Sequence, residues 1–457
     1  MTSLFSAQEL HQVLGISPQE GVTGVAIDSR FVKPGDLFFA LRGDHQDGHA
    51  FIPQAISAGA RVIVAERPLS GSFVVPDSYA ALCTLAQYAR DRCTGTVVGI
   101  TGTVGKTSLK EALKTVLSPF GSVHASERSF NNRWGVPLTL SNLPHDTSYS
   151  LVEIGSNHPG EIASLATLVQ HNGAVLTGIE VGHTAFFGSL SGVAQEKMMI
   201  LEMLKPGDWA VFPEDSPYAD ALRKKAQAQG ARAITFGTQE QATVRLCSWT
   251  CREQTSTVTV QILGKTYHYT VSLPGEPGII NSACVLAVGQ ALGLPCSDLL
   301  PALQTLTPLE GRGKRLQLSL PGERTVTLFD ETYNANPPSM QAALKILGLQ
   351  TPTGEGRRLA VLGDMGELGE SAVALHQNLV PTLGKAGIDK VFCCGPLMKK
   401  LYAILATSRQ GVWTETAQDL APLVEEQLKA GDIVLIKGSR SLHMEEIIHF
   451  LTKRVSQ

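Results

Sequence analysis

The sequence has few cysteines, no long hydrophobic run and no excess of charge of one sign. Its 457 residues include eight cysteines, too few for a disulfide scaffold and in no zinc-binding pattern, which favours buried free thiols. No apolar stretch reaches the roughly 20 residues that a membrane-spanning helix needs. The 38 basic and 41 acidic residues argue against nucleic acid as the main partner. The N-terminus has no basic region followed by an apolar one, so we expect a cytoplasmic protein without a secretory signal.

Hydrophobic residues are plentiful and follow an α/β rhythm. Their share of 43% is ample for packed cores and excludes a disordered chain. Residues 1–94 mix short strand-like runs, such as 25–28 and 36–41, with helical segments. Residues 95–312 alternate strands with helices, which predicts a mainly parallel sheet covered by helices on both faces. A segment rich in Gly, Pro and charge at 306–314 ends this region, and a fresh α/β series fills residues 313–457. We therefore predict an α/β protein of three domains.

One segment of the middle region breaks the rhythm of strand and helix. Residues 243–273 contain runs that alternate apolar and polar side chains, and Gly264–Lys265 supplies a turn between two of them. Alternation over such short runs is typical of half-buried antiparallel strands. We expect a small antiparallel part at the edge of the central sheet.

The most specific local pattern lies at 96–108, TVVGITGTVGKTS. An apolar strand runs into glycines, then into Gly105-Lys106-Thr107, and a helical segment follows. Glycines let backbone N–H groups surround phosphate oxygens, and the helix N-terminus favours negative charge. Lys106 can reach the outer phosphates, and the Thr107 hydroxyl can bind Mg²⁺. The longer form of this loop has a glycine where Ile100 stands, so a glycine-rich turn without a ligand is the structural alternative.

Three later residues extend the nucleotide hypothesis. Glu153 ends a predicted strand, where carboxylates of a parallel sheet can hold Mg²⁺ beside a phosphate loop. His183 follows the next strand and is either a ligand or a structural histidine. Lys197 lies in a helical stretch, and composition alone makes it a surface lysine.

These residues, together with several longer blocks, resemble the Mur ligases of peptidoglycan synthesis. The resemblance extends over essentially the whole chain. It rests on the phosphate loop, on Glu153, His183 and Lys197, and on five blocks spread along the sequence. The blocks lie at 22–60, 129–140 (SFNNRWGVPLTL), 330–340 (DETYNANPPSM), 362–369 (LGDMGELG) and 437–441 (KGSRS). The YNANP and LGDMGELG blocks are specific, whereas the phosphate loop is shared with many other nucleotide-binding proteins.

The resemblance implies a fold, a reaction and its cofactors. It implies a UDP-substrate domain at 1–94, a central ATP-binding domain at 95–312 and a Rossmann-like domain at 313–457. It further implies a ligase that uses ATP and two Mg²⁺ ions to join D-alanyl-D-alanine to UDP-N-acetylmuramoyl-tripeptide through an acyl phosphate. Lys197 would be carbamylated and would bind the second Mg²⁺, which reverses its interpretation as a surface lysine. We expect a monomer, and the third residue of the tripeptide stays open between meso-diaminopimelate and L-lysine.

The family pattern assigns site residues position by position. Nucleotide binding falls on Gly102, Thr103, Val104, Gly105, Lys106, Thr107, Ser108, Asn281, Arg312 and Asp330. The magnesium ligands are Thr107, Glu153, His183 and Lys197, and the catalytic group is Lys106, Glu153, His183 and Lys197. Substrate contacts fall on Ser29, Arg30, Gly48, His49, Asn131, Asn132, Tyr333, Asn334, Asn336, Lys437, Ser439 and Arg440.

Residue chemistry leaves structural alternatives open for part of this set. Arg30 suits a diphosphate, but it could equally be a surface residue, and Arg312 could be a solvated linker charge. The Asn-x-Asn-Pro sequence at 334–337 is a turn signal in its own right. Residues 437–440 could cap a helix predicted at 441–451.

The chain also departs from the family pattern at three positions. Pro277 stands near an expected histidine, Glu180 replaces a small or amide residue, and Ala185 replaces a frequent glutamate.

Other functions remain as alternatives. The sister ligase that adds the third amino acid usually carries an Asp-Asn-Pro-Arg-type segment, which is missing from this sequence, and a folylpolyglutamate synthase-like ligase would lack the N-terminal domain. The chain could also be a nucleotide-gated binding module without ligase activity. Against this stands the intact set of catalytic residues, Lys106, Thr107, Glu153, His183 and Lys197. A small stand-alone kinase would not need the C-terminal α/β region.

Overall fold

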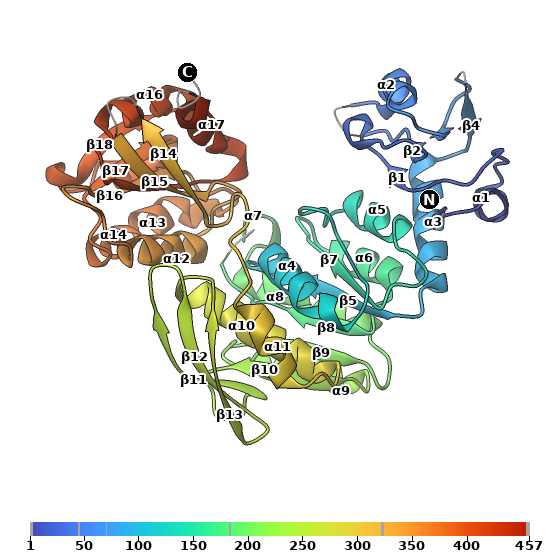
Figure 1. Ribbon diagram of the computed structural model, residues 1–457, viewed down its shortest axis with the longest axis horizontal. Helices are drawn as coiled ribbons and strands as arrows, with labels where there is room; N and C mark the ends of the chain where they lie inside the picture. Colours follow the sequence, from blue (N-terminus) through green and yellow to red (C-terminus); the bar gives the residue numbers. More distant parts are fainter. Residues whose placement is uncertain (1–2, 44–45, 70, 182–183, 321–323, 454–457) are drawn as a thin grey trace.

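Three sheets follow one another along the chain in the computed structural model, which describes residues 3–43, 46–69, 71–181, 184–320 and 324–453. Each sheet has its own helices, and we call the three units the N-terminal, central and C-terminal domains. The N-terminal and C-terminal domains lie at opposite ends of the molecule, and the central domain lies between them (Figure 1).

The N-terminal sheet consists of four short parallel strands in the order β1-β2-β3-β4. The strands are β1 Val25–Ala26, β2 Leu37–Phe39, β3 Val62–Ala65 and β4 Ser72–Val74. The helices are α1 Ala7–Leu14, α2 Ile52–Ser57 and α3 Ser78–Arg92. The strand predicted at 25–28 ends at Ala26, because the Asp28 carboxylate caps a 3-10 turn over Ser29–Phe31. This turn presents Ser29 and Arg30 at the end of the first strand.

The central sheet has nine strands in the order β13-β12-β11-β10-β9-β8-β5-β7-β6. The strands are β5 Thr96–Thr101, β6 Val123–Ala125, β7 Tyr149–Glu153, β8 Gly173–Leu176, β9 Trp209–Pro213, β10 Arg232–Gly237, β11 Val244–Cys251, β12 Ser256–Ile262 and β13 Lys265–Val271. Only β11, β12 and β13 pair antiparallel, so the predicted antiparallel part is confirmed. Its hairpin turns at Leu263–Gly264, where both residues have positive φ, as a two-residue type I′ turn requires.

Helices cover both faces of this sheet. They are α4 Lys106–Leu117, α5 Gly135–Ser141, α6 Glu161–Val169, α7 Thr184–Phe187, α8 Leu190–Met198, α9 Ala219–Ala228, α10 Gly275–Ala291 and α11 Cys296–Leu303. Side chains of β5 alternate between the two cores: Val98 packs with Leu109 of α4, and Val97 packs with Ile162 of α6. Burial on both faces fixes β5 in the middle of the sheet, so its carboxyl end is a rigid support for the loop that follows.

The C-terminal sheet has six strands in the order β14-β15-β19-β16-β17-β18, and only β14 is antiparallel to its neighbour. The strands are β14 Lys314–Leu320, β15 Arg324–Glu331, β16 Arg358–Gly363, β17 Lys390–Cys394, β18 Gln410–Thr414 and β19 Ile433–Lys437. The helices are α12 Pro337–Gly348, α13 Ala372–Gln377, α14 Val380–Lys385, α15 Pro396–Tyr402, α16 Ala417–Gln427 and α17 Glu445–Lys453. The helix predicted at 441–451 begins four residues later, after a 3-10 turn over Arg440–Leu442.

Two further expectations can be compared with the described ranges. All eight cysteines are free, as predicted, but Cys247 is exposed on β11, so the expectation of burial is wrong there. Among the helices in the part of the chain that the structure describes, none combines the length and the apolar character needed to cross a membrane.

Candidate functional site

The phosphate loop runs from the end of β5 to the start of α4. Gly102 has φ +142°, and a Cβ on it would lie 2.0 Å from Thr177 Oγ1, so no side chain fits there. Gly105 has φ +83° and forms the N-cap of α4, with Asn281 Oδ1 of α10 lying 3.3 Å from the position of its missing Cβ. Glycine is the residue that takes such conformations without steric cost. Thr177 and Asn281 therefore approach the loop closely at its two glycines.

Lys106 is the first residue of α4 and lines the cavity next to the loop. Its ammonium group donates to the Gly102 carbonyl at 2.6 Å and to the Thr103 carbonyl at 3.3 Å. Burial lowers the pKa of Lys106, Glu153 opposes this shift, and the positive charge of Arg312 adds to it. The two carbonyls are weak partners for a cation, so an anionic phosphate would be a better one.

Thr107 and Glu153 meet at the carboxyl ends of β5 and β7. The Thr107 hydroxyl donates to Glu153 Oε2 at 2.8 Å, and Asn131 Nδ2 donates to Glu153 Oε1 at 2.7 Å. Glu153 is 1% exposed, and a buried carboxylate requires such partners. A hydroxyl and a carboxylate are hard oxygen donors of the kind Mg²⁺ prefers. The pair fits a magnesium ion in its chemistry, and Asn131 is the residue that orients the carboxylate.

Lys197 lies in α8 and is buried. Its exposure of 1% contradicts the surface position that composition alone predicts. Its ammonium group donates to Ser156 Oγ at 2.9 Å. Burial and then repulsion from Lys106 lower the pKa of Lys197 to about 7. Glu180 also faces the cavity, and burial raises the pKa of its carboxyl. His183 lies outside the described residues.

A cavity of about 910 Å³ lies between the central and C-terminal domains. Its central wall carries the phosphate loop, Glu153, Asn131 and the first two turns of α10. Its opposite wall is formed by residues of β15, β19 and most of α12. Predicted site residues on the lining are Thr103, Val104, Gly105, Lys106, Thr107, Ser108, Asn131, Glu153, Asn281, Arg312, Tyr333, Asn334, Asn336 and Lys437. The structure therefore brings together most of the predicted nucleotide residues and part of the predicted substrate residues.

The linker between the two domains is braced by Asp330. Its Oδ2 accepts from the Gly311 N–H at 2.8 Å, and its Oδ1 accepts from the Thr332 hydroxyl at 2.6 Å. The neighbouring Arg312 guanidinium lies 4.1 Å from the centre of the Tyr333 ring, within cation–π range. Both Asp330 oxygens are thus used inside the protein, and the carboxylate fixes where Arg312 enters the cavity.

The YNANP segment is held to the end of β19 by Lys437. The Lys437 ammonium group donates to the Asn334 carbonyl at 2.9 Å and forms an ion pair with Glu331 at 3.1 Å. Asn336 is the N-cap of α12, where its side chain accepts from the Ser339 N–H at 2.9 Å. The turn chemistry anticipated for this sequence is therefore present, and the same residues line the cavity.

Four predicted substrate residues lie in the N-terminal domain, away from this cavity. Ser29 is buried and donates to Gln54 Oε1 at 2.8 Å. Arg30 is exposed and forms an ion pair with Asp28 at 2.6 Å, which holds the pKa of that carboxyl below its usual range. The Arg30 guanidinium points from the 3-10 turn into solvent and is accessible to an anionic ligand.

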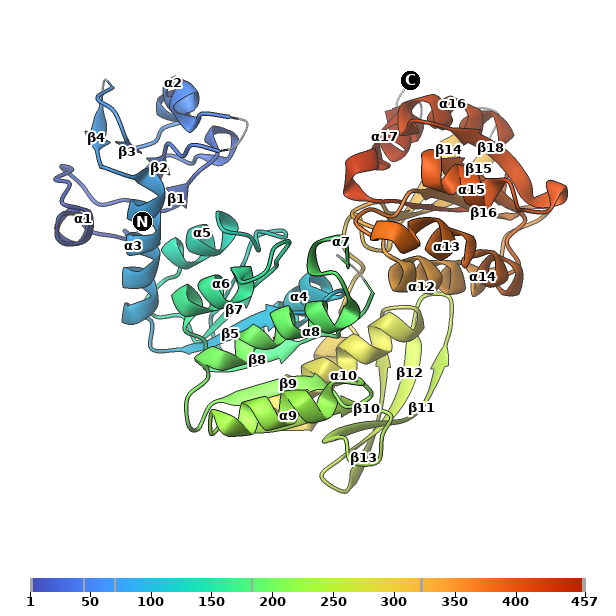
Figure 2. The ribbon, with the colours of Figure 1, turned by 180° about the vertical axis from the view of Figure 1, so that it is seen from behind.

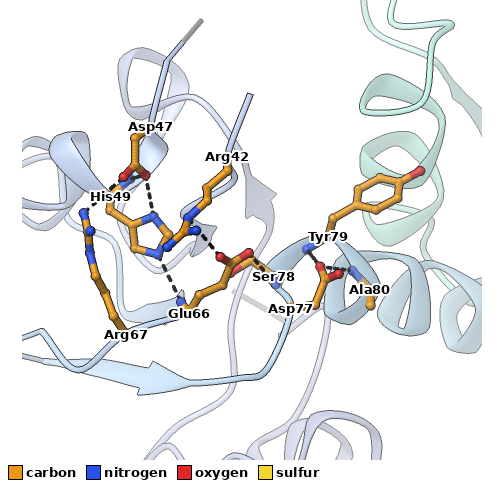
Figure 3. Close-up of polar contacts among 9 residues, drawn as sticks. All are labelled: Arg42, Asp47, His49, Glu66, Arg67, Asp77, Ser78, Tyr79 and Ala80. Carbon is orange, nitrogen blue, oxygen red and sulfur yellow. Dashed lines mark hydrogen bonds and ion pairs between the residues drawn. The ribbon is translucent and has the colours of Figure 1, made fainter. Parts of the chain in front are cut away.

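Gly48 and His49 begin a 3-10 turn of the same domain, Gly48–Phe51. Figure 3 shows His49 between Asp47 and Glu66. A Cβ on Gly48 would lie 2.5 Å from the Leu41 carbonyl oxygen. His49 is buried, with Nδ1 2.6 Å from Asp47 Oδ1 and Nε2 accepting from the Glu66 N–H at 3.0 Å. Both ring nitrogens are occupied, so contact between the ring and a substrate would require one of these bonds to break.

The remaining predicted residues have local partners. Asn132 caps α5 by accepting from the Trp134 and Gly135 N–H groups. Ser439 lies 3.2 Å from Ser441 through their hydroxyls, and the exposed Arg440 pairs with Glu445 at 2.9 Å.

Residue-by-residue reasoning missed the roles of Ser129 and Ser156. Ser129 Oγ lies 3.1 Å from Thr107 Oγ1, and Ser156 is the partner of Lys197. The only sequence signal was their position beside Asn131 and Glu153.

Comparison with known families decides where the chain belongs. Three family models match successive parts of it: the "Mur ligase family, catalytic domain" at 21–82, the "Mur ligase middle domain" at 100–289 and the "Mur ligase, glutamate ligase domain" at 314–440. The chain belongs to the Mur ligase family. The predicted α/β fold of three domains is thereby confirmed.

Individual Mur ligases resemble the chain over nearly its whole length. A UDP-N-acetylmuramoyl-tripeptide–D-alanyl-D-alanine ligase of Bacillus subtilis is 30% identical over 444 residues, covering 94% of this chain and 93% of the relative. A crystal structure of MurF from Acinetobacter baumannii superposes with a TM-score of 0.84 at 28% identity, covering 98% and 99% of the two chains. MurF ligase from Thermotoga maritima, solved in complex with ADP, gives 0.78 at 29% identity, covering 95% and 98%.

Proposed function

We propose that the chain is an ATP-dependent ligase that adds D-alanyl-D-alanine to UDP-N-acetylmuramoyl-tripeptide, in the cytoplasmic synthesis of peptidoglycan precursors. The observation that carries this proposal is the composition of the two walls of the 910 Å³ cavity. The phosphate loop and Glu153 form one wall, and Tyr333, Asn334 and Lys437 form the other. A phosphate-activating centre thus faces polar groups suited to a second substrate, and the named relatives carry out this reaction.

The reaction has two steps. A carboxylate oxygen of the tripeptide attacks the γ-phosphorus of ATP, forming an acyl phosphate and releasing ADP. The amine nitrogen of D-alanyl-D-alanine then attacks the acyl carbon, the C–O bond to phosphate breaks, and the nitrogen loses a proton as the amide forms. Neither reactant is unusually reactive, so orientation across the cavity and charge neutralisation are what the protein must supply.

The residues around the cavity suit these two demands. The first step brings two anions together, and Lys106 and Arg312 both place positive charge in the cavity beside the phosphate loop. Thr107 and Glu153 would hold Mg²⁺, which would neutralise phosphate charge. Lys437 keeps the segment containing Asn334 fixed, so that a bound amine would meet the acyl phosphate in one orientation.

We propose further that Lys197 is carbamylated and supplies an oxygen ligand. Only a neutral amine can add CO₂, and burial lowers the pKa of Lys197 to about 7. A large neutral fraction is therefore available near neutral pH. The buried Ser156 hydroxyl, 2.9 Å from the amine, is a ready partner for a carbamate oxygen.

We propose domain boundaries at 94/95 and 312/313, with UDP-substrate binding in the first domain and a monomeric enzyme. The boundaries fall between α3, which ends at Arg92, and β5, which begins at Thr96, and just before β14. The exposed Arg30 at the end of β1 supports a diphosphate site there.

Phosphate release tests the proposed activity. We expect release only when ATP, Mg²⁺, UDP-N-acetylmuramoyl-tripeptide and D-alanyl-D-alanine are all present, because the acyl phosphate forms from ATP and the tripeptide and loses its phosphate when the dipeptide amine attacks it. Lys106→Ala is expected to lower the rate on the order of 10²–10³-fold, whereas Lys114→Ala, an exposed lysine of the same helix, should retain it. Depleting CO₂ should lower the rate and bicarbonate should restore it. Release without the dipeptide, or none with either tripeptide variant, would contradict the assignment.

A further inference from the structure

Two adjacent residues of the central domain contact the N-terminal domain, the phosphate loop and the linker that leads to the C-terminal domain. The Arg128 guanidinium of the central domain lies 4.6 Å from the centre of the Phe31 ring, which belongs to the N-terminal domain. The next residue, Ser129, has its hydroxyl 3.1 Å from Thr107 Oγ1 at the phosphate loop. The same hydroxyl accepts from Nη2 of Arg312, on the linker to the C-terminal domain, at 3.3 Å. We call the Arg128–Ser129 pair the junction, because it connects the N-terminal domain, the phosphate loop and the linker.

A buried lysine fixes this junction. Lys110 of α4 is 0% exposed, and its ammonium group donates to the carbonyls of Ser126 and Arg128, the latter at 2.5 Å, and pairs with Glu111 at 3.0 Å. All three of its donors are thus used. Arg128 has φ +49°, a left-handed conformation that residues with a side chain rarely adopt. The charge-assisted bond to its carbonyl holds the turn in this conformation.

The segment that follows the junction links the Glu153 carboxylate to the N-terminal domain. Asn131 donates to Glu153 at 2.7 Å, and its carbonyl accepts from the Gly155 N–H at 2.7 Å. Three residues later, Trp134 lies edge to face with Tyr79 of α3, with ring centres 4.9 Å apart. Helix α5 then packs beside α3, as Figure 2 shows. A shift of this loop would move groups at the nucleotide site and at the N-terminal domain together.

We propose that Lys110 is a positioning residue that holds the Arg128–Ser129 junction and thereby couples nucleotide binding to binding of the UDP-substrate. The inference rests on the proposed function, because it takes the N-terminal domain to hold that substrate. Lys110 itself touches neither ligand. Nucleotide at the phosphate loop fixes Thr107 and hence Ser129, and the adjacent Arg128 then holds Phe31 and its domain in the orientation that receives the second ligand.

Coupling between two sites is measured as a ratio of affinities and is reciprocal. A lysine that only stabilises the fold would change the melting temperature but would leave this ratio unchanged. The ratio is obtained by calorimetric titration of the full chain with UDP-N-acetylmuramoyl-tripeptide, without nucleotide and with saturating Mg²⁺ and ADP. Three variants are compared: Lys110→Met, Arg128→Gln and the control Lys114→Met, which lies one turn further along α4 and is exposed.

We expect nucleotide to tighten binding of the UDP-substrate by at least about fivefold in the natural chain and in Lys114→Met. The ratio should fall towards one in Lys110→Met and in Arg128→Gln. Arg128 is exposed, so Arg128→Gln keeps the fold and gives a result even if Lys110→Met unfolds. A natural chain without coupling, or an Arg128→Gln variant that retains it, overturns the inference. Failure of the proposed function is distinguishable, because the natural chain would then not bind this UDP-substrate at all.

Discussion

Lys110, Glu153 and Lys197 are almost completely buried, although each belongs to a residue type that usually stays at the surface. Each has partners that the sequence does not reveal: two loop carbonyls for Lys110, Thr107 and Asn131 for Glu153, and Ser156 for Lys197. Composition alone predicts an exposed Lys197, because burial is decided by segments far away in the sequence. The family resemblance replaces the surface interpretation of Lys197 with a functional one, but it assigns no role to Lys110.

His171 is a buried residue outside the cavity whose titration should govern stability in acid. Burial lowers its pKa to about 4, although a hydrogen bond between Nε2 and the Ile200 carbonyl at 2.8 Å opposes the shift. The unfolded chain would bind this proton near pH 6.5, so from about pH 6.5 down to 4 the unfolded state holds more protons and is favoured. The free energy of unfolding should therefore fall by roughly 2 kcal/mol between pH 7.5 and pH 5 from this group.

Urea unfolding at these two pH values checks the prediction. His171→Gln keeps a donor for Ile200 but does not titrate, so its free energy of unfolding should depend less on pH. Replacement of the exposed His449 by Gln serves as the control and should leave the pH dependence unchanged. An equal slope in His171→Gln and the natural chain would contradict the assignment of this group.

The start of α12 combines a cap with a wall of the cavity. Asn336 and Ser339 form a reciprocal capping box, with each side chain bonded to the backbone N–H of the other. Asn336→Ala is expected to lower the free energy of unfolding by about 1 kcal/mol, whereas Asn336→Asp should keep most of the cap. Chemical denaturation measures this difference.

Measuring phosphate release by the same two variants distinguishes two roles of Asn336, as a helix cap and as a substrate contact. If Asn336→Asp is stable but slow, the amide group itself takes part in binding. If only the alanine variant is slow, the effect follows from loss of the cap. Equal stability of all three proteins would contradict the capping role.

Strands with a strong apolar pattern were predictable from the sequence, whereas several short or charged strands at the edges of the sheets were not. The run at 96–101 is predicted to the residue, because apolar side chains on both faces mark a strand in the middle of a parallel sheet. The three-residue strands β4 and β6 lie at the ends of their sheets and were missed. Strand β14 was missed for a second reason, since its start at Lys314 adjoins the charged linker. Pairing with a neighbour, rather than local composition, decides such strands.

The site was predictable only where a motif carries its own geometry. Glycines followed by Lys106 and Thr107 predict a phosphate loop, because the loop's backbone does the binding. The segment around Asn334 was recognised by resemblance alone, and nothing in its sequence places it opposite that loop. The cavity results from the packing of two domains, and its lining joins residues as far apart in the sequence as Thr103 and Lys437.

The central and C-terminal domains touch beyond the linker. Gln350, which follows α12, is buried and donates from Nε2 to the Glu253 carbonyl in the antiparallel part at 2.9 Å. Nearby, Lys345 of α12 pairs with Glu276 of α10 at 3.2 Å, but both side chains are more than half exposed. Figure 1 shows α12 resting above α10 and the hairpin strands. A buried hydrogen bond should hold the two domains together more effectively than an exposed ion pair.

Differential scanning calorimetry tests this ranking. Gln350→Ala should loosen the contact, so that the C-terminal domain melts at a lower temperature and the overall transition broadens or divides. Lys345→Ala is the comparison and should change the melting temperature little, because an exposed pair contributes only about 0–1 kcal/mol. A larger effect from Lys345→Ala than from Gln350→Ala would reverse the ranking.

The junction at Arg128 and Ser129 constrains the length of the chain as well as its composition. Successive Cα atoms are about 3.8 Å apart. An inserted residue would therefore prevent Arg128 from reaching Phe31 while Ser129 reaches Thr107. Insertions should therefore be excluded between 126 and 131 during divergence of related sequences. The tip of the β12–β13 hairpin has the opposite character, because Leu263 is 79% exposed and a Cβ on Gly264 meets no atom within 4 Å. Extra residues can accumulate at this tip without changing the distance between the proposed binding sites.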